Sequence, residues 1–305
     1  MEMTRRGLLL GTAAIGMAAL APVRLSAQSA NLIRKAIPSS GEMIPVVGVG
    51  TARRYEEVKS DADLPPLRET LAKFKEVGAT VIDSSPTYGT AEEVVGRILD
   101  EQKSRTGLFL ATKVSISGRE AGVAQIEQSF KRLRTDKIDL IAVHNLRDTE
   151  IHLATLRALK QAGRIRYVGC TTSFDNQYGD FEAMMKRETL DFIQVDYALD
   201  NRNAAERVIP LAKDRGMAVM INLPFGRSRL FGAVQGKPLP DWAAEFDCKS
   251  WAQFFLKYLV SHEAVTCAVP GMARAEYVTD NIGAAQGRLP DAAMRKRMEA
   301  FIDGL

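Results

Sequence analysis

The chain has 305 residues, of which 46% are apolar and 26% are charged, and its formal net charge is +4 at pH 7. This length and composition are typical of a soluble globular protein with one large core. The small net charge, without long runs of one sign, argues against nucleic acid as a partner. The cysteines are too few and too scattered for a disulfide framework or a metal site, so we expect small core residues and one loop thiol at Cys170, Cys248 and Cys267.

Residues 1–27 are predicted to be an export signal that precedes the folded domain at residues 31–305. The paired arginines Arg5 and Arg6 are followed by a modest apolar run and by small residues around Ala27. This order is typical of a twin-arginine signal, so we expect recognition by the twin-arginine translocase, cleavage near Ala27 and a periplasmic or exported location. A retained membrane anchor is the alternative, but the run is short and rich in Ala and Gly, so no stable anchor is expected.

Eight apolar runs alternate with amphipathic segments along the rest of the chain. The segments 67–78 and 123–133 carry apolar residues at helical spacing, and Gly78, Gly163 and Gly216 follow such segments as left-handed C-caps would. The runs show no polar face, which is typical of parallel strands covered by helices. We expect strands at 46–50, 79–83, 108–114, 138–144, 166–171, 191–197, 217–223 and 265–270.

Eight strands that alternate with helices predict a closed (β/α)8 barrel, the TIM-barrel form of the α/β class. An open doubly wound sheet is the rival, although no GxGxxG motif opens a helix. Residues 31–45 are predicted to form a β-hairpin that turns at Ser39–Gly41. We expect this hairpin to plug the N-terminal mouth of the barrel.

Four polar residues are expected to converge at the C-terminal ends of the strands, where the active sites of such barrels lie. Asp83, Lys113 and His144 lie at the ends of the second, third and fourth runs, and Tyr88 follows in a loop. The Lys113 ammonium is expected to lower the pKa of Tyr88, while Asp83 keeps Lys113 ionised. A neutral His144 could donate a hydrogen bond to a substrate carbonyl. An Asp–Lys pair or a lone His is by itself more often structural, so the prediction depends on all four.

These residues resemble the motifs of the aldo-keto reductase family. The resemblance extends from about Ile33 to the C-terminus. The similar motifs are the Asp–Tyr signature D-S-S-P-T-Y-G (83–89), the following helix TAEEVVGRIL (90–99), the lysine strand ATKV (111–114) and the histidine strand AVHN (142–145).

The resemblance implies an enzyme that interconverts a small carbonyl compound and its alcohol. In that family a reduced nicotinamide gives hydride to the carbonyl carbon, and the resemblance makes Tyr88 the donor of a proton to the oxygen. It also implies that His144 orients the carbonyl and that Lys113 with Asp83 tunes the tyrosine.

The cofactor positions of the family match this sequence less uniformly. Gln194 and Tyr197 match the residues that hold the carboxamide and stack on the nicotinamide. Thr171 keeps a hydroxyl for the carboxamide, whereas Thr172 stands where an Asn is usual, which weakens that contact. The remaining matches are Gly50 and Thr51 after the first strand, and Leu223, Pro224, Phe225, Arg227 and Leu230 in the loop expected to cover the pyrophosphate.

The adenosine end of the cofactor is expected near residues 269–281. Pro270 and Asn281 hold the family's spacing, but Gly271 and Met272 occupy positions where many members carry groups for the 2′-phosphate. Arg274 is the first candidate to replace them, because a guanidinium suits a phosphate well. The resemblance therefore favours NADP(H) and leaves NAD(H) open.

Two other functions fit some of these features. A Schiff-base aldolase also uses a lysine at a strand end, but it needs an unpaired amine, whereas Lys113 has Asp83 as its expected partner. A nicotinamide-binding, redox-sensing accessory subunit with little turnover, like the potassium-channel β-subunits of the family, is the second. An exported reductase has no evident supply of reduced cofactor, which favours this alternative.

Overall fold

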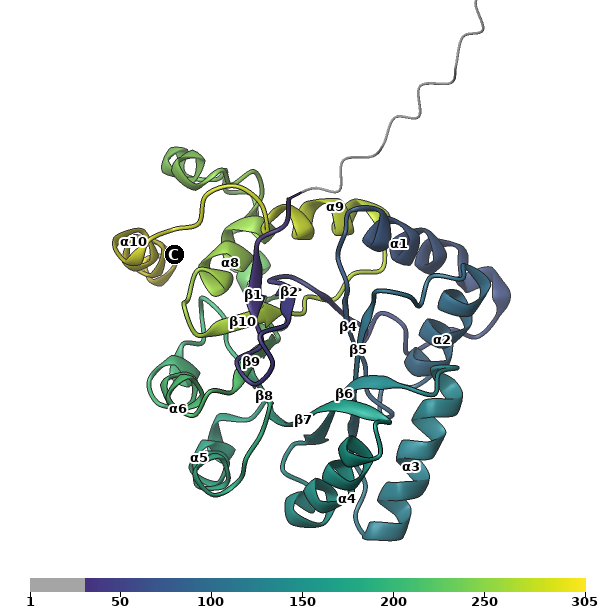
Figure 1. The fold of residues 1–305 in the computed structure, drawn as a ribbon. Coiled ribbons are helices and arrows are strands. Elements are labelled where there is room, and N and C mark those ends of the chain that lie inside the picture. Colours follow the sequence, from purple (N-terminus) through teal and green to yellow (C-terminus); the bar gives the residue numbers. More distant parts are fainter. Residues whose placement is uncertain (1–30) are drawn as a thin grey trace, which may run out of the picture.

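The computed structural model describes residues 31–305, and the predicted export signal at residues 1–27 lies outside this part of the chain. Eight parallel strands form one sheet in chain order, and the bridges Val47–Ala268 and Gly50–Gly271 join its two edges. The sheet is a nearly closed (β/α)8 barrel, as predicted (Figure 1). Its strands are β3 (Val49–Gly50), β4 (Val81–Asp83), β5 (Phe109–Val114), β6 (Ile138–His144), β7 (Ile165–Thr172), β8 (Phe192–Asp196), β9 (Ala218–Asn222) and β10 (Val265–Ala268).

The long helices lie outside the barrel and cover the strands (Figure 1). Gly78, Gly163 and Gly216 have φ angles of 81°, 71° and 64°, so the predicted left-handed C-caps are confirmed. The α-helices are α1 (Pro65–Glu76), α2 (Ala91–Glu101), α3 (Arg119–Arg132), α4 (Thr149–Gln161), α5 (Tyr178–Arg187), α6 (Val208–Asp214), α7 (Arg229–Ala233), α8 (Trp251–Val260), α9 (Ala275–Gly283) and α10 (Ala292–Asp303). Short 3-10 helices are η1 (Asp61–Asp63), η2 (Asp175–Gln177), η3 (Asn203–Ala205), η4 (Gly226–Ser228) and η5 (Asp241–Phe246).

The inside of the barrel is a packed apolar layer near the N-terminal ends of the strands. Phe109, Leu140, Tyr167 and Phe192 belong to this inner cluster, and the rings of Phe109 and Tyr167 are stacked 5.8 Å apart. Side chains alternate between the two faces of a strand, so residues an even number of positions further on also face inward. The polar strand ends are thus held above a solid floor rather than over an open pore.

A β-hairpin closes the N-terminal end of the barrel, which confirms the prediction for residues 31–45. Its strands β1 (Arg34–Ala36) and β2 (Met43–Pro45) pair antiparallel. Ile37 and Ile44 are buried in the inner cluster of the barrel, and the Ser40 hydroxyl lies 2.8 Å from the Tyr167 hydroxyl. The site must therefore open at the opposite end.

The C-terminal helices pack through aromatic side chains. Trp242 lies 5.6 Å from Phe254, and Trp251 is stacked 5.8 Å from Phe255, measured between ring centroids. These contacts place both tryptophans in the packing of this region. Cys170, Cys248 and Cys267 are free and buried. Among residues 31–305, no helix has the length and apolar character needed to cross a membrane.

Candidate active site

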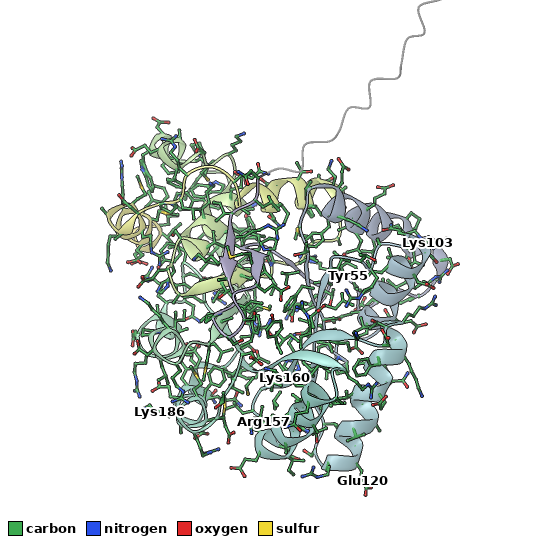
Figure 2. All side chains as sticks on the ribbon, in the orientation of Figure 1. Tyr55, Lys103, Glu120, Arg157, Lys160 and Lys186 are labelled. Carbon is green, nitrogen blue, oxygen red and sulfur yellow. The ribbon has the colours of Figure 1, made fainter. Side chains whose placement is uncertain are left out.

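Asp83, Lys113, His144 and Tyr88 meet at the C-terminal end of the barrel. Asp83 is the last residue of β4, Lys113 lies near the end of β5 and His144 is the last residue of β6. Tyr88 follows in the loop between β4 and α2. The structure thus brings together all four residues that the sequence singled out, whereas other charged side chains such as Lys186 lie on the outer surface of the helices (Figure 2).

A buried ion pair forms the centre of the site. Lys113 Nζ donates to Asp83 Oδ1 at 2.8 Å and Oδ2 at 2.9 Å, and also to the Ser84 carbonyl at 2.7 Å. Lys113 is only 2% exposed and Asp83 5%. Burial opposes the charge on Lys113, but Asp83 and Tyr88 outweigh it, so the pKa of Lys113 is raised and the amine stays an ammonium.

Tyr88 lies beside this ammonium. Lys113 Nζ is 5.3 Å from the centroid of the Tyr88 ring, and the His144 ring meets the Tyr88 ring edge-on at 6.0 Å. Burial raises the pKa of Tyr88, and the Lys113 charge offsets only part of that rise. The expectation of a lowered pKa is wrong here, because desolvation of the phenolate is the larger effect.

His144 is neutral in this site. Burial, with the charges of Lys113 and Arg147, lowers the pKa of His144 to about 3. Its Nδ1 lies 3.3 Å from the Ser85 hydroxyl oxygen, which in turn lies 2.9 Å from Thr87 Oγ1. A neutral imidazole with one nitrogen occupied can donate from the other. Sequence reasoning did not single out Ser85, although it lies within the Asp–Tyr signature at residues 83–89.

Thr171 and Gln194 lie on the strands that follow His144, next to the four predicted catalytic residues. His144 pairs with Thr171 across β6 and β7, and Thr171 pairs with Gln194 across β7 and β8. Gln194 is 3% exposed, yet both its amide atoms lack a hydrogen-bond partner. Buried polar atoms without a partner are rare, so this amide fits a ligand that both donates and accepts.

Tyr197 and Thr172 lie elsewhere than predicted. Tyr197 is an odd number of residues from the inward-facing Phe192, and its ring packs outside the barrel against α8, with its hydroxyl 3.2 Å from the Tyr258 hydroxyl. A ring in that position has no face toward the barrel mouth, so its predicted stacking role is not supported. Thr172 Oγ1 donates to the Gln177 side chain within the following loop. Its hydroxyl is thus already engaged.

The first strand and the loop before α9 approach each other closely. A side chain at Gly50 would place its Cβ 2.7 Å from the Val269 carbonyl oxygen, so glycine is required there. Thr51 Oγ1 bonds to the Asp83 carbonyl at 3.2 Å and therefore braces the centre of the site. Met272 is buried in the core, which leaves it no polar role. The other predicted positions of this region are the adjacent Pro270 and Gly271, and Asn281, which is buried at 4% exposure.

Arg274 and Arg227 are exposed at the edge of the site. Arg274 precedes α9 and its nearest partner is Glu276, with Nη1 and Oε1 3.4 Å apart. The predicted contact of Arg274 with a 2′-phosphate stays a prediction. Arg227 lies in the loop between β9 and α7.

The segment after β9 runs through η4 into α7 and is tied to the loop after β8; it contains Leu223, Pro224, Phe225, Arg227 and Leu230. Arg229 Nε lies 2.9 Å from Asp200 Oδ2, and a Cβ at Gly226 would lie 2.6 Å from Asp200 Oδ1. Gly226 has a φ of 55°, so both its backbone and its space favour glycine. Phe225 packs on Phe231 at 4.9 Å between centroids. These contacts hold the loop at the rim where it could cover a bound cofactor.

The structure is a (β/α)8 barrel with a buried polar site at the C-terminal ends of its strands, and the sequence profile of the Aldo/keto reductase family matches residues 46–302. This chain belongs to that family. It is 31% identical to Aldo-keto reductase YhdN of Bacillus subtilis (strain 168) over 216 residues, which are 66% of this chain and 63% of that protein. It is 27% identical to Methylglyoxal reductase YeaE of Escherichia coli (strain K12) over 280 residues, 88% of this chain and 95% of that one.

The fold is also that of solved aldo/keto reductases. One from Klebsiella pneumoniae, in complex with NADP and acetate, superposes with a TM-score of 0.74 at 23% identity. The match covers 89% of this chain and 96% of that chain. At this identity the likeness shows the barrel and leaves the substrate open.

Proposed function

We propose that this protein is an NADP(H)-dependent oxidoreductase that reduces an aldehyde or ketone to its alcohol, or catalyses the reverse. The observation that carries the proposal is the buried Lys113–Asp83 ion pair beside Tyr88, with a neutral His144 at the ring edge. This arrangement suits proton donation to an oxygen that gains negative charge.

Each residue has one task in the proposed reaction. When bound, the reduced nicotinamide supplies a hydride to the carbonyl carbon. Tyr88 donates its hydroxyl proton to the carbonyl oxygen, and the Lys113 ammonium stabilises the phenolate that remains. His144 donates a hydrogen bond that orients the carbonyl. Asp83 keeps Lys113 charged and fixed in place.

The raised pKa of Tyr88 fits the role of an acid. At neutral pH the phenol is protonated, so its proton is available to the substrate oxygen. The ion pair with Asp83 speaks against a Schiff-base mechanism at Lys113, because two short hydrogen bonds hold that amine as an ammonium.

The rim of the barrel fits a nicotinamide cofactor. The unpaired amide of Gln194 complements the carboxamide group, and Thr171 lies next to it. The exposed guanidinium groups of Arg227 and Arg274 suit phosphates. The K. pneumoniae relative contains NADP, which supports NADP(H) over NAD(H) for this chain.

Replacement of Tyr88 tests the proposal. Tyr88→Phe removes the proton donor and keeps the ring, so kcat for carbonyl reduction should fall at least about a hundredfold, while the Kd for NADPH should change little. A panel of aldehydes and ketones with NADPH and NADH, followed by absorbance, identifies a usable substrate first. Fluorescence titration gives the Kd.

Tyr167→Phe is a matched control. Tyr167 lies in the inner cluster at the opposite end of the barrel, where its hydroxyl bonds to Ser40 and Glu42 of the hairpin, so loss of that oxygen should leave activity nearly unchanged. Near-full reduction by the Tyr88→Phe variant would contradict the catalytic assignment. Tight NADPH binding with negligible turnover of every carbonyl by the unmodified protein would favour the accessory-subunit alternative instead.

A further inference from the structure

Asn222 ends β9 at the same rim as the predicted cofactor residues. It follows Met220 by two residues, as Gln194 follows Phe192, and both Met220 and Phe192 belong to the inner cluster of the barrel. The alternation of strand side chains therefore turns Asn222 and Gln194 to the inside of the mouth. Thr171 completes the group, since it pairs with Gln194 across β7 and β8, and Asn222 Nδ2 lies 3.5 Å from Thr171 Oγ1.

The two amides leave three buried polar atoms without a partner. These atoms are Gln194 Oε1, Gln194 Nε2 and Asn222 Oδ1. Two of them are acceptors and one is a donor. Native proteins rarely leave such atoms unpaired, so a group of them around one threonine hydroxyl indicates a ligand position.

The atoms specify the chemistry of that ligand. Two acceptors and one donor complement a group that offers two N–H bonds and one carbonyl oxygen, which is a primary carboxamide. An anionic group fits poorly, because Asp196 pairs with Asn222 across β8 and β9 and its Oδ1 is also buried and unpaired. A carboxylate placed here would meet that acid and two further acceptors.

We propose that Asn222 is a binding residue of this site, whose Oδ1 accepts one N–H of a primary carboxamide that Gln194 holds from the other side. The inference rests on the proposed function, in which this group is the carboxamide of the nicotinamide. Asn222, Gln194 and Thr171 would then hold the carboxamide together.

A pair of cofactors that differ only at this group tests the proposal. The 3-acetylpyridine analogue of NADP keeps the carbonyl but carries a methyl group in place of the NH2. The measured quantity is the ratio of the Kd of the analogue to the Kd of NADP, from titrations at fixed salt. For Asn222→Ala this ratio should fall about fivefold to tenfold below that of the unmodified protein, because only NADP loses a hydrogen bond.

Two further variants keep the test decisive. Asn222→Gln retains an uncharged amide acceptor at the end of β9, so the ratio should stay close to that of the unmodified protein. Asn222→Leu fills the volume without an acceptor, so the ratio should fall as it does in Asn222→Ala. Asn203→Ala, the same change at an exposed position in η3, should leave both constants unaltered. Thermal unfolding of each variant shows that the comparison is made on folded protein.

The outcomes separate this inference from the proposed function. An unmodified protein without saturable NADP binding overturns the proposed function and the inference with it. Saturable binding with the same ratio in the unmodified protein, Asn222→Ala and Asn222→Leu overturns the role of Asn222 alone. A ratio that falls equally in Asn222→Gln would assign the effect to shape and also overturn the proposed hydrogen bond.

Discussion

At the scale of single residues, we expect the Ser85 hydroxyl to favour one of the two tautomers of neutral His144. The Thr87 backbone N–H donates to Ser85 Oγ at 3.3 Å, so one lone pair of this oxygen is occupied. The Ser85 proton can then go to His144 Nδ1, which leaves the proton of the neutral ring on Nε2. We therefore expect Ser85 to act as a positioning residue that favours the tautomer able to donate from Nε2.

Ser85→Ala should remove the hydrogen bond that favours the Nε2–H tautomer of His144. We expect kcat for carbonyl reduction to fall about tenfold, the loss of one well-placed hydrogen bond, with little change in the Kd for NADPH. Nitrogen-15 NMR of the imidazole should show a larger share of the Nδ1–H form. The chain has three histidines, so the His144 signal can be assigned from a single variant. Ser85→Thr keeps the hydroxyl and should restore both readouts; an unchanged tautomer in Ser85→Ala would refute the positioning role.

The residue scale is also where sequence reasoning failed most visibly. Tyr197 and Asn222 each follow an apolar run, and motif similarity selected Tyr197. Side chains of a strand alternate between its two faces, so Tyr197, five residues after the inward-facing Phe192, turns toward α8. Asn222, two residues after the inward-facing Met220, turns into the barrel. The net pKa shift of Tyr88 could not be read from the sequence either, because it depends on how far burial outweighs a neighbouring charge.

At the scale of elements, the N-terminal hairpin is held to the barrel by Lys35. Its Nζ donates to three backbone carbonyls near the start of β10, those of Val260 at 2.9 Å, His262 at 2.7 Å and Val265 at 2.7 Å. Burial, followed by the charge of Arg295, lowers the pKa of Lys35 to about 8, although Glu263 acts in the opposite direction. We call Lys35 with its three carbonyl partners the Lys35 latch; below pH 8 its amine is charged, and burial of that charge lowers the stability of the folded protein.

The contribution of Lys35 to the free energy of unfolding depends on pH. The folded-state pKa of about 8 is below the ordinary value of 10.5, so between these values the unfolded chain binds more protons than the folded one. The contribution of Lys35 to the free energy of unfolding therefore rises as the pH increases from about 8 to 10.5 and is lowest below pH 8.

Lys35→Met should remove the latch and this pH dependence. We expect the variant to be less stable by about 1–3 kcal/mol at pH 9, because the carbonyls around Lys35 lose the N–H groups of its amine. The difference from the unmodified protein should grow between pH 7.5 and pH 9.5, as measured by urea unfolding at several pH values. Lys186→Met, at an exposed position of α5, is the control. A difference that is the same at both ends of the range would contradict the lowered pKa.

The elements themselves were largely predictable from the sequence. All eight barrel strands overlap the apolar runs, because strands buried on both faces need continuous apolar residues. The hairpin turn and the glycine C-caps were predictable because they depend on local chemistry. The Lys35 latch was not, since its three acceptors lie more than two hundred residues away in the chain.

At the scale of the whole molecule, the two ends of the barrel have separate tasks. The site lies at the C-terminal ends of the strands, and the hairpin that follows the predicted signal closes the N-terminal end. The chain enters the described fold beside α9, where the Ile33 N–H donates to the Ala285 carbonyl at 2.7 Å. We therefore expect that the translocase can engage the signal of an already folded, cofactor-loaded barrel, since the signal would leave the molecule at the end away from the site.

Replacement of both arginines of the signal tests the export prediction. Arg5→Lys with Arg6→Lys keeps the charge but not the guanidinium pair, so the precursor should stay in the cytoplasm. Its carbonyl reductase activity there should be normal, because the fold and the site lie within residues 31–305. Arg34→Lys, just after the signal, should be exported like the unmodified protein. Cell fractionation and N-terminal sequencing check this prediction. Undiminished export of the double variant would overturn the assignment of residues 1–27 as a twin-arginine signal. A mature N-terminus before residue 20 would overturn cleavage near Ala27.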